Sequence, residues 1–379
     1  MFRWVRALVV ASIAAPALAA WGAGASPSQG QGDSARSEQE KQAFVEAMKP
    51  RRAGRQVVVV LALNEGTETT DLLLPHAALQ RSGLVDVQVV APRGGRVDLY
   101  PALQVDGAQA MADFDGAHPS GADYVIVPAM REDDDPAVTS WLRQQASKGA
   151  RVIGICSGAL VVGRAGLLDG RRFAGHWYDR STLLRRHPGS THVPNQRYVV
   201  DRGVATTTGI TASVPTMLAL VEAIGGPQKA QALAAELGAA SWSPQHDSAP
   251  FGLNGEKAAR YLLNKAAFWR HERWSVDAQD GSDDIALALA ADAWSRTGRV
   301  SVDAASPSGP VKLRSGLVLV AQPAVADASP RLPLSADLKP VQQLDRSLCQ
   351  IAERFGAPRR DWVMQEMEYP GVAAAACET

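Results

Sequence analysis

The clearest signal of the fold in this sequence is the segment Arg151-Val-Ile-Gly154-Ile-Cys156-Ser-Gly158-Ala-Leu-Val-Val-Gly-Arg164. The apolar, β-branched run before the cysteine predicts a buried strand, and the apolar run after it predicts a helix. Gly154 and Gly158 flank Cys156 at two residues on either side, and glycine permits the positive φ or close backbone approach that a sharp strand-to-helix turn requires. The spacing therefore predicts a nucleophile elbow, with the side chain of Cys156 at the end of a sheet.

A thiol at this turn would lie beside the N-terminus of a helix. The unpaired N–H groups and the dipole of that helix favour the thiolate, so the elbow predicts a lowered pKa for Cys156. The alternative is a core cysteine between two structural glycines, because free cysteines are often buried. The glycine spacing favours the elbow.

Strands and helices alternate around this turn. The continuous apolar run 57–63 is typical of a strand buried on both faces of a parallel sheet. The further elements expected, in chain order, are a helix over 72–81, a strand over 85–91, a hairpin within 97–111, a strand over 124–128, a helix over 135–148, extended segments at 171–177 and 198–208, and a helix over 211–224. This order predicts a three-layer α/β sandwich with a mostly parallel sheet, in which ligands bind at the carboxyl ends of the strands.

The last third of the chain predicts a smaller C-terminal α/β region. Its strand, helix, strand and extended segment (274–278, 284–296, 300–304 and 316–321) repeat the order of elements over 57–111, without a second Gly-x-Cys-x-Gly. We interpret this region as a degenerate partial repeat, and the alternative is an unrelated α/β appendage. Helices are also expected over 255–270 and 341–355, followed by a loose tail.

The first twenty residues have the parts of a secretory signal peptide. Arg3 and Arg6 precede a short apolar run, and Ala17-Leu-Ala19 supplies a small-residue cleavage site. The apolar run is too short to span a hydrocarbon core of about 30 Å. We expect cleavage near Ala19 or Ala20, a periplasmic or secreted protein, and no stable membrane span after cleavage.

The chain therefore divides into four parts. A signal peptide (1–20) precedes residues 21–54, which are rich in Gly, Ser, Gln and charge and predict a flexible linker with a short helix over 38–48. The main α/β domain covers residues 55–240, and the C-terminal α/β region covers 241–379.

The composition limits which partners and cofactors are expected. The 39 basic and 39 acidic residues cancel, so no net field attracts nucleic acid. The histidines are scattered and none pairs with cysteines at zinc spacing, and no phosphate- or dinucleotide-binding fingerprint is present. We expect no metal, no other cofactor and no nucleic acid. The three cysteines do not make a disulfide framework, and a Cys349–Cys377 bridge is left open.

Two side chains are candidates to act with Cys156, because a cysteine nucleophile needs a base or cationic partner and often a third, orienting group. His176 lies on the next extended segment, and Asp71 begins the first core helix, so both are expected at the same sheet end. Singly, each has an ordinary explanation, a solvated loop histidine or a helix cap. Together, the three residues favour a catalytic site.

The span 55–240 resembles the ThiJ/PfpI superfamily, the DJ-one-like proteins related to class I glutamine amidotransferases. The matching motifs are Gly154-Ile-Cys156-Ser-Gly158, Ala165-Gly-Leu-Leu-Asp-Gly-Arg-Arg172, His176-Trp177, and Asp201-Arg-Gly-Val-Ala-Thr-Thr-Thr-Gly209 followed by Thr211-Ala212. The variant with Gly-Leu-Leu-Asp-Gly and His-Trp is most similar to the ligand-sensing half of AraC-type regulators. The resemblance implies that Cys156 is the elbow nucleophile, His176 its neighbouring histidine, and Asp71 the acidic residue that touches the cysteine.

Two departures from the family pattern bear on activity. Relatives carry Pro-Gly-Gly where this chain has Pro128-Ala-Met130, so the side chain of Met130 is expected to crowd a substrate bound at an oxyanion hole made by the backbone N–H groups of Met130 and Ser157. Ser157 also stands where protease-like members have histidine, which argues against peptidase activity.

Two classes of function fit these residues. The first is a cysteine-dependent hydrolase or lyase that acts on a small carbonyl, amide or nitrile-like compound, with His176 shuttling the proton. The second is a non-catalytic redox or small-ligand sensor, because a reactive thiol also serves sensing. No helix-turn-helix signature follows the domain, so we do not expect a DNA-binding regulator. A small-molecule partner is expected, and a homodimer and a partner-binding role for the C-terminal region are left open.

Overall fold

The computed structural model describes residues 27–252, 272–323, 330–371 and Cys377, and the side chains from residue 33 onward within these ranges. The expected signal peptide (1–20) and the helix expected over 255–270 lie outside the described residues.

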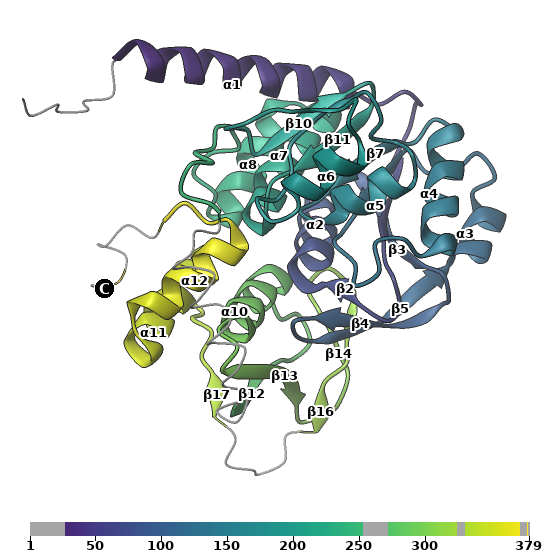
Figure 1. Ribbon diagram of the computed structural model, residues 1–379. Coiled ribbons are helices and arrows are strands. Elements are labelled where there is room, and N and C mark those ends of the chain that lie inside the picture. Colours follow the sequence, from purple (N-terminus) through teal and green to yellow (C-terminus); the bar gives the residue numbers. More distant parts are fainter. Residues whose placement is uncertain (1–26, 253–271, 324–329, 372–376, 378–379) are drawn as a thin grey trace, which may run out of the picture.

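A mostly parallel sheet forms the centre of the molecule (Figure 1). Its strands run in the order β10-β11-β7-β6-β1-β3-β5-β15-β14, with β4 paired to β5 and β2. Their bounds are β1 Gln56–Leu61, β2 Thr67–Glu68, β3 Val85–Ala91, β4 Gly95–Tyr100, β5 Gln104–Ala110, β6 Tyr124–Val127, β7 Arg151–Gly154, β10 Tyr198–Asp201, β11 Val204–Thr207, β14 Val311–Lys312 and β15 Val318–Leu319. The pairs from β3 through β1, β6 and β7 to β11 are parallel, and β10 is antiparallel.

Helices cover both faces of this sheet. The buried residues of one face pack with α1 (Pro27–Ala47), α2 (Thr69–Ser82), α7 (Ser213–Gly225) and α8 (Pro227–Leu237), and those of the other with α3 (Met111–Ala117), α4 (Pro136–Ser147) and α5 (Gly158–Arg164). Every residue of β6 and β7 is buried, as a strand covered on both faces requires. The predicted three-layer α/β sandwich is confirmed.

A short excursion follows α5. It contains the two-stranded parallel sheet of β8 (Arg172–Phe173) and β9 (Thr191–His192), with α6 (Arg180–Arg186) between the strands. The 3-10 helix η1 (Ile210–Ala212) then leads from β11 into α7. This excursion brings residues 174–179 back toward the carboxyl ends of the central strands, where the extended segments were expected.

The linker expected over 21–54 is not a free segment between residues 33 and 48. Phe44 in α1 and Met48, directly after the end of that helix, are both buried on the core. The ring of Phe44 lies 4.9 Å from that of Tyr198, and the hydroxyl of Tyr124 donates a 2.6 Å hydrogen bond to the Met48 carbonyl. The short helix expected over 38–48 thus largely coincides with the second half of α1, but these contacts hold it on the core, where a flexible linker was expected.

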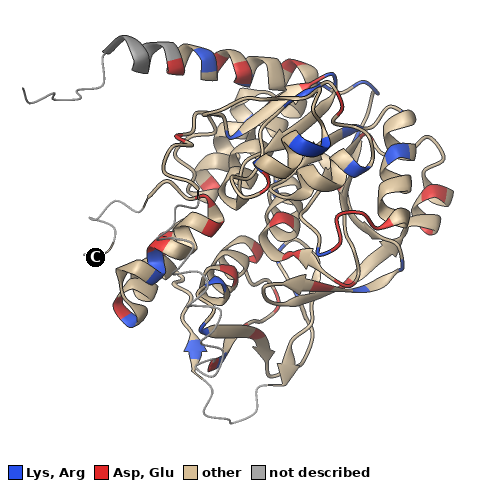
Figure 2. Cartoon of the chain, in the orientation of Figure 1, with Lys and Arg blue, Asp and Glu red and all other residues tan. Residues whose placement is uncertain are grey.

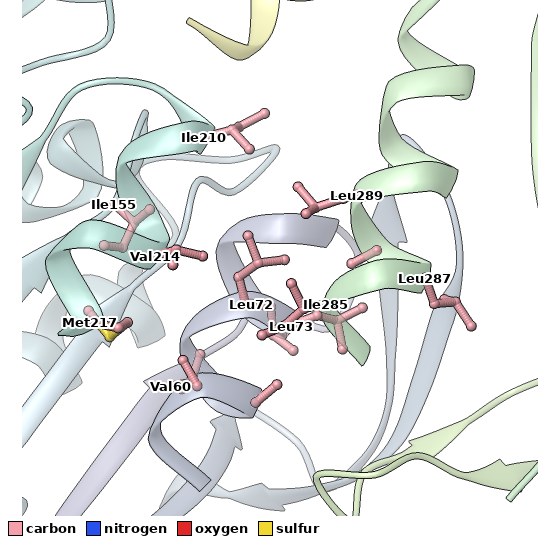
Figure 3. Packing of buried hydrophobic residues seen from close by; sticks show 14 of the residues in the cluster. Val60, Leu72, Leu73, Ile155, Ile210, Val214, Met217, Ile285, Leu287 and Leu289 are labelled. Carbon is pink, nitrogen blue, oxygen red and sulfur yellow. The ribbon is translucent and has the colours of Figure 1, made fainter. Parts of the chain in front are cut away.

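The C-terminal region has its own four-stranded sheet, in the order β16-β13-β12-β17. Its elements are β12 Glu272–Asp277, α10 Asp284–Arg296, β13 Val300–Ser306, β16 Gln322–Pro323, β17 Arg331–Leu332, α11 Gln342–Phe355 and α12 Ala357–Met367. Helix α10 packs against α2, where Leu72 and Leu73 face Ile285 and Leu289 (Figure 3). The region therefore shares a hydrophobic core with the main domain.

The cysteines are used differently from one another. Cys349 in α11 and Cys377 form a disulfide, and Cys156 is a free, buried thiol. The pairing left open by the sequence is thus formed in the structure.

Acidic and basic residues are interspersed along the chain rather than gathered on one face of the ribbon (Figure 2). Among the described helices, none combines the length and the hydropathy that a membrane span requires.

Candidate functional site

Cys156 occupies the turn between β7 and α5, at the carboxyl end of a central strand. Its φ is +52°, in the left-handed region that non-glycine residues rarely adopt. A Cβ at Gly158 would lie 1.9 Å from the Val127 carbonyl oxygen, and one at Gly154 would lie 2.9 Å from Val162 Cγ2. The glycines therefore permit close approach of the backbone, while the unusual φ falls on the cysteine itself.

The thiol of Cys156 lies in a nearly closed, polar environment. The residue is 5% exposed, and its backbone N–H donates to Thr207 Oγ1 at 3.0 Å. The Sγ atom lies 4.0 Å from Ser157 Oγ, and Ser157 Oγ donates to the carboxylate of Asp179. Burial raises the pKa of Asp179, and the hydrogen bond from Ser157 and the charge of His176 oppose this increase.

The predicted lowering of the thiol pKa was wrong in sign. Burial raises the pKa of Cys156 well above its ordinary value, and the negative charges of Asp71, Glu68 and Asp179 raise it further, whereas Arg296 lowers it. Helix α5 has only seven residues, and its N-terminus does not outweigh desolvation and three carboxyl groups. These surroundings favour the thiol form of Cys156 over the thiolate.

Asp71 lies beside this thiol in the first turn of α2. It is fully buried, and its Oδ2 atom accepts a 3.1 Å hydrogen bond from the backbone N–H of Ala129. Its Oδ1 atom has no partner among the described residues. Burial raises the pKa of Asp71 well above the ordinary carboxyl value, and the charge of Glu68 raises it further. The site therefore holds a buried carboxyl group with a raised pKa and one unpartnered oxygen, within electrostatic reach of the thiol.

Glu68 caps the helix that carries Asp71. Its Oε2 atom accepts hydrogen bonds from the Asp71 N–H at 2.6 Å and from Thr70 Oγ1 at 2.8 Å. Its other oxygen, Oε1, forms a 2.7 Å ion pair with Arg296 Nη2. Arg296 ends α10, so the C-terminal region contributes a cation to the site of the main domain.

Tyr100 completes this cluster of ionisable groups. Burial raises the pKa of its phenol, and the charges of Glu68, Asp71 and Cys156 add to the increase. The guanidinium of Arg131 lies 5.0 Å from the centre of the Tyr100 ring. The Tyr100 phenol is therefore within electrostatic reach of the thiol and of both carboxyl groups.

His176 is held by the C-terminal region rather than by Cys156. Its Nε2 atom lies 3.1 Å from the Glu366 carbonyl oxygen, and the Trp177 indole N–H donates to the Gln365 carbonyl at 2.7 Å. Among the described residues, no hydrogen bond joins His176 to Cys156. The structure thus brings Asp71 to the cysteine but orients the expected proton shuttle toward the last turn of α12.

The side chain of Met130 does not crowd the site. It packs in the core cluster on the face of the sheet covered by α3, α4 and α5, whereas Cys156 belongs to the cluster on the other face. An antiparallel bridge between Thr67 and Met130 sets this orientation. The expected crowding was wrong, and replacing Met130 by glycine would leave a core cavity.

Sequence reasoning missed Glu68, Tyr100, Asp179, Thr207 and Arg296. Asp179 had a signal, because it follows the candidate residue His176 by three residues. Glu68 is an unusual N-cap residue, and nothing in the sequence pairs it with Arg296, which lies 228 positions away.

No group of three His, Cys, Asp or Glu side chains is arranged to hold a metal within the described parts of the chain. A separate cavity of about 310 Å³ lies beside the turn 195–197 and the loop 245–247, and its lining includes neither Cys156 nor Asp71.

Residues 55–223 match the family model described as the DJ-1/PfpI family. The isonitrile hydratase of Pseudomonas putida is 32% identical over 187 residues, which are 48% of this chain and 77% of that protein. The chain belongs to the DJ-1/PfpI family. The resemblance seen in the sequence motifs is thereby confirmed.

Other DJ-1/PfpI relatives are matched over a smaller share of their length. The HTH-type transcriptional regulator GlxA of Rhizobium meliloti (strain 1021) is 33% identical over 174 residues, 45% of this chain and 52% of the regulator. The HTH-type transcriptional regulator CdhR of Pseudomonas aeruginosa is 37% identical over 95 residues, 25% of this chain and 28% of the regulator. The chain thus spans about half of the length of GlxA and a smaller share of CdhR. The crystal structure of Drosophila melanogaster DJ-1beta superposes with a TM-score of 0.45 and 21% identity, covering 49% of this chain and all of that one.

Proposed function

We propose that the chain is a cysteine-dependent enzyme that adds water to the carbon of a small, neutral, nitrile-like compound, with an isonitrile as the first candidate. The observation that carries this proposal is the buried Asp71 carboxyl with its unpartnered Oδ1 atom, whose pKa is raised near the Cys156 thiol, whose pKa is raised too. In this proposal Cys156 is the nucleophile and Asp71 the general acid.

The charge of the site supports a neutral substrate. Three carboxyl groups, those of Glu68, Asp71 and Asp179, face the thiol against a single nearby guanidinium. An anionic substrate would be disfavoured by this excess of carboxyl groups and would lose hydration in a nearly closed site. A neutral molecule with a carbon that can accept a proton suits an acid held in its neutral form.

The reaction can be written with every atom balanced. Asp71 gives its proton to the terminal carbon of R–N≡C, and Cys156 Sγ adds to the same carbon while the thiol proton returns to Asp71. The product is the thioimidate R–N=CH–S–Cys. Water then adds to that carbon, the C–S bond breaks, and a proton passes to sulfur through Asp71. The formamide R–NH–CHO and the free thiol result.

The relatives of this chain support two different functions for this site. Isonitrile hydratase, the relative of which this chain covers the larger share, supports turnover. The regulators GlxA and CdhR support a second function, ligand binding without turnover. The near closure of Cys156, only 5% exposed, favours this second candidate, so the proposed experiment must distinguish the two.

We expect the purified protein to convert a small alkyl isonitrile to its formamide, and Asp71→Asn to lower turnover by at least about 10²-fold. The acid must be protonated, so turnover should fall as pH rises through the raised pKa of Asp71. Formamide release measured across pH tests this, and Asp71→Asn should lack that limb of the profile.

Asp113→Asn is the matched control, because Asp113 is an exposed aspartate in the first turn of α3. It should keep the wild-type profile. A wild-type profile in Asp71→Asn would refute the role of Asp71. Absence of formamide at any pH, with the isonitrile still bound in calorimetry, would replace turnover by the binding function.

We also propose that the protein acts outside the cytoplasm. The basic and apolar segments of the first twenty residues support this, as does the Cys349–Cys377 disulfide, since disulfides persist in oxidising compartments. In a Gram-negative expression host, we expect the mature chain in the periplasmic fraction with a new N-terminus near Ala20. An intact Met1 in the cytoplasmic fraction would refute export.

A further inference from the structure

The C-terminal region matches the first unit of the main domain in its strand pairing. Strands β12 and β13 pair in parallel over six residue pairs, as β1 and β3 do. In each unit a helix crosses between the strands, α10 in one and α2 in the other, and the hairpins β14–β15 and β4–β5 follow. Even the hydrogen bond that follows the first strand recurs, from the Ala62 N–H to Val90 and from the Ala278 N–H to Ala305.

The two crossover helices are joined by reciprocal ion pairs. Arg81 in the last turn of α2 pairs with Asp283, the N-cap of α10, at 2.9 Å. Arg296 in the last turn of α10 pairs with Glu68, the N-cap of α2, at 2.7 Å. Arg296 lies 215 positions after Arg81, and Asp283 lies 215 positions after Glu68. Equivalent residues therefore exchange the same contact, which is what a two-fold axis produces between identical surfaces.

The sheet edge shows the same relation. Strands β5 and β15 are antiparallel, with Val105 opposite Leu319, and the Val320 N–H donates to the Gln104 carbonyl at 2.9 Å. At the same spacing of 215, Leu319 is the counterpart of Gln104 and Val320 that of Val105. Val105 thus faces the counterpart of Gln104, and Gln104 faces the counterpart of Val105, as a two-fold axis between the two strands requires. Between the ion pairs and the strand edge, α2 and α10 bury their apolar faces against each other (Figure 3).

We infer that residues 272–321 are a degenerate second copy of residues 56–110, packed on the first across an internal two-fold axis, and that this copy supplies Arg296 as a positioning residue for the Cys156 site. The chain is then a covalent pseudo-dimer with one reactive centre. The role of Arg296 rests on the proposed reactivity of Cys156, whereas the repeat does not.

Only one of the two copies contributes an acidic residue to a cysteine site. The counterpart of Asp71, 215 positions later, is Ala286, and the Gly-x-Cys-x-Gly turn at residues 154–158 lies outside the repeated residues 56–110, so it is not duplicated with them. The pair of Arg81 and Asp283 therefore has no cysteine to serve. Arg296 instead contacts Glu68, Asp292 and Glu366, and its charge lowers the pKa values of Cys156 and Asp71 against the effect of burial.

The contacts define what Arg296 does. It holds Glu68 through Oε1, while Oε2 of the same carboxylate accepts the N–H of Asp71, so the guanidinium fixes the turn that presents the acid. It also neutralises Glu68, whose charge would otherwise disfavour a thiolate at Cys156. Loss of Arg296 should therefore make the thiolate harder to form.

The experiment compares Arg296→Gln with Arg81→Gln in the full chain. The thiolate of Cys156 is followed by its ultraviolet absorbance against pH, subtracting the matching Cys156→Ser protein. We expect Arg296→Gln to raise the midpoint by at least about one pH unit, because one opposite charge commonly shifts a pKa by about 1–3 units. Arg81→Gln breaks the counterpart ion pair and should leave the midpoint unchanged. Arg296→Lys keeps the positive charge and should return the midpoint most of the way to the wild-type value.

Equal midpoints in all variants, or equal shifts in Arg296→Gln and Arg81→Gln, would overturn the inference. If Arg296→Gln does not fold, the double variant Arg296→Met with Asp292→Asn removes the cation together with a buried partner and is judged in the same way. An Arg296-dependent midpoint without isonitrile turnover would support the inference and refute the enzyme. Turnover that needs Cys156 but is unaffected by Arg296→Gln would support the enzyme and refute the positioning role of Arg296.

Discussion

Cys156→Ser should abolish isonitrile turnover, with a loss of at least about 10³-fold, because removal of a covalent nucleophile costs more than removal of its accessories. The serine hydroxyl is smaller, less polarizable and far weaker as an acid, so it neither adds to the carbon nor leaves from the intermediate as sulfur does. Formamide release per enzyme, measured at saturating substrate, gives the loss directly.

The substitution should leave the fold intact, because serine nearly matches cysteine in shape and the backbone N–H of residue 156 keeps its bond to Thr207. Chemical unfolding and isonitrile binding by calorimetry check this. Turnover that survives in Cys156→Ser would remove the nucleophile from the mechanism. Conversely, lost turnover with retained binding would place the defect in the chemical step.

Gly158→Ala should lower the free energy of unfolding by at least about 3 kcal/mol, near the upper end for single substitutions. The added Cβ would lie 1.9 Å from the Val127 carbonyl oxygen. That oxygen cannot withdraw freely, because it accepts a 2.9 Å hydrogen bond from the Ile155 N–H at the end of β7. Urea unfolding should show a lower midpoint with an unchanged slope.

Gly116→Ala is the matched control for this prediction. Gly116 lies exposed in α3, and a Cβ there meets nothing within 4 Å. Alanine favours helix over glycine by about 1 kcal/mol, so this variant should be as stable as the wild type or slightly more so. A Gly158→Ala protein as stable as Gly116→Ala would contradict the close packing of α5 on β6.

The layered fold and the position of the cysteine follow from local patterns in the sequence. Strands such as 85–91, and the helix over 284–296, are predicted with their observed bounds because burial on both faces or on one helical stripe imposes a local pattern. The turn around Cys156 was predictable for the same reason, since the glycines that permit it are neighbours in sequence. The adjacency of Asp71 followed from the rule that carboxyl ends of parallel strands meet.

The electrostatics and the partners of the site depend instead on contacts between segments that are far apart in the chain. The thiol pKa depends on burial and on carboxylates from three separate elements, so a helix N-terminus read from sequence predicted the wrong direction. His176 faces the end of α12, and Met130 faces the core, because of contacts with distant segments. The approach of Arg296 to Glu68 depends on how one unit packs on another, and no local pattern encodes such a contact across 228 positions of the chain.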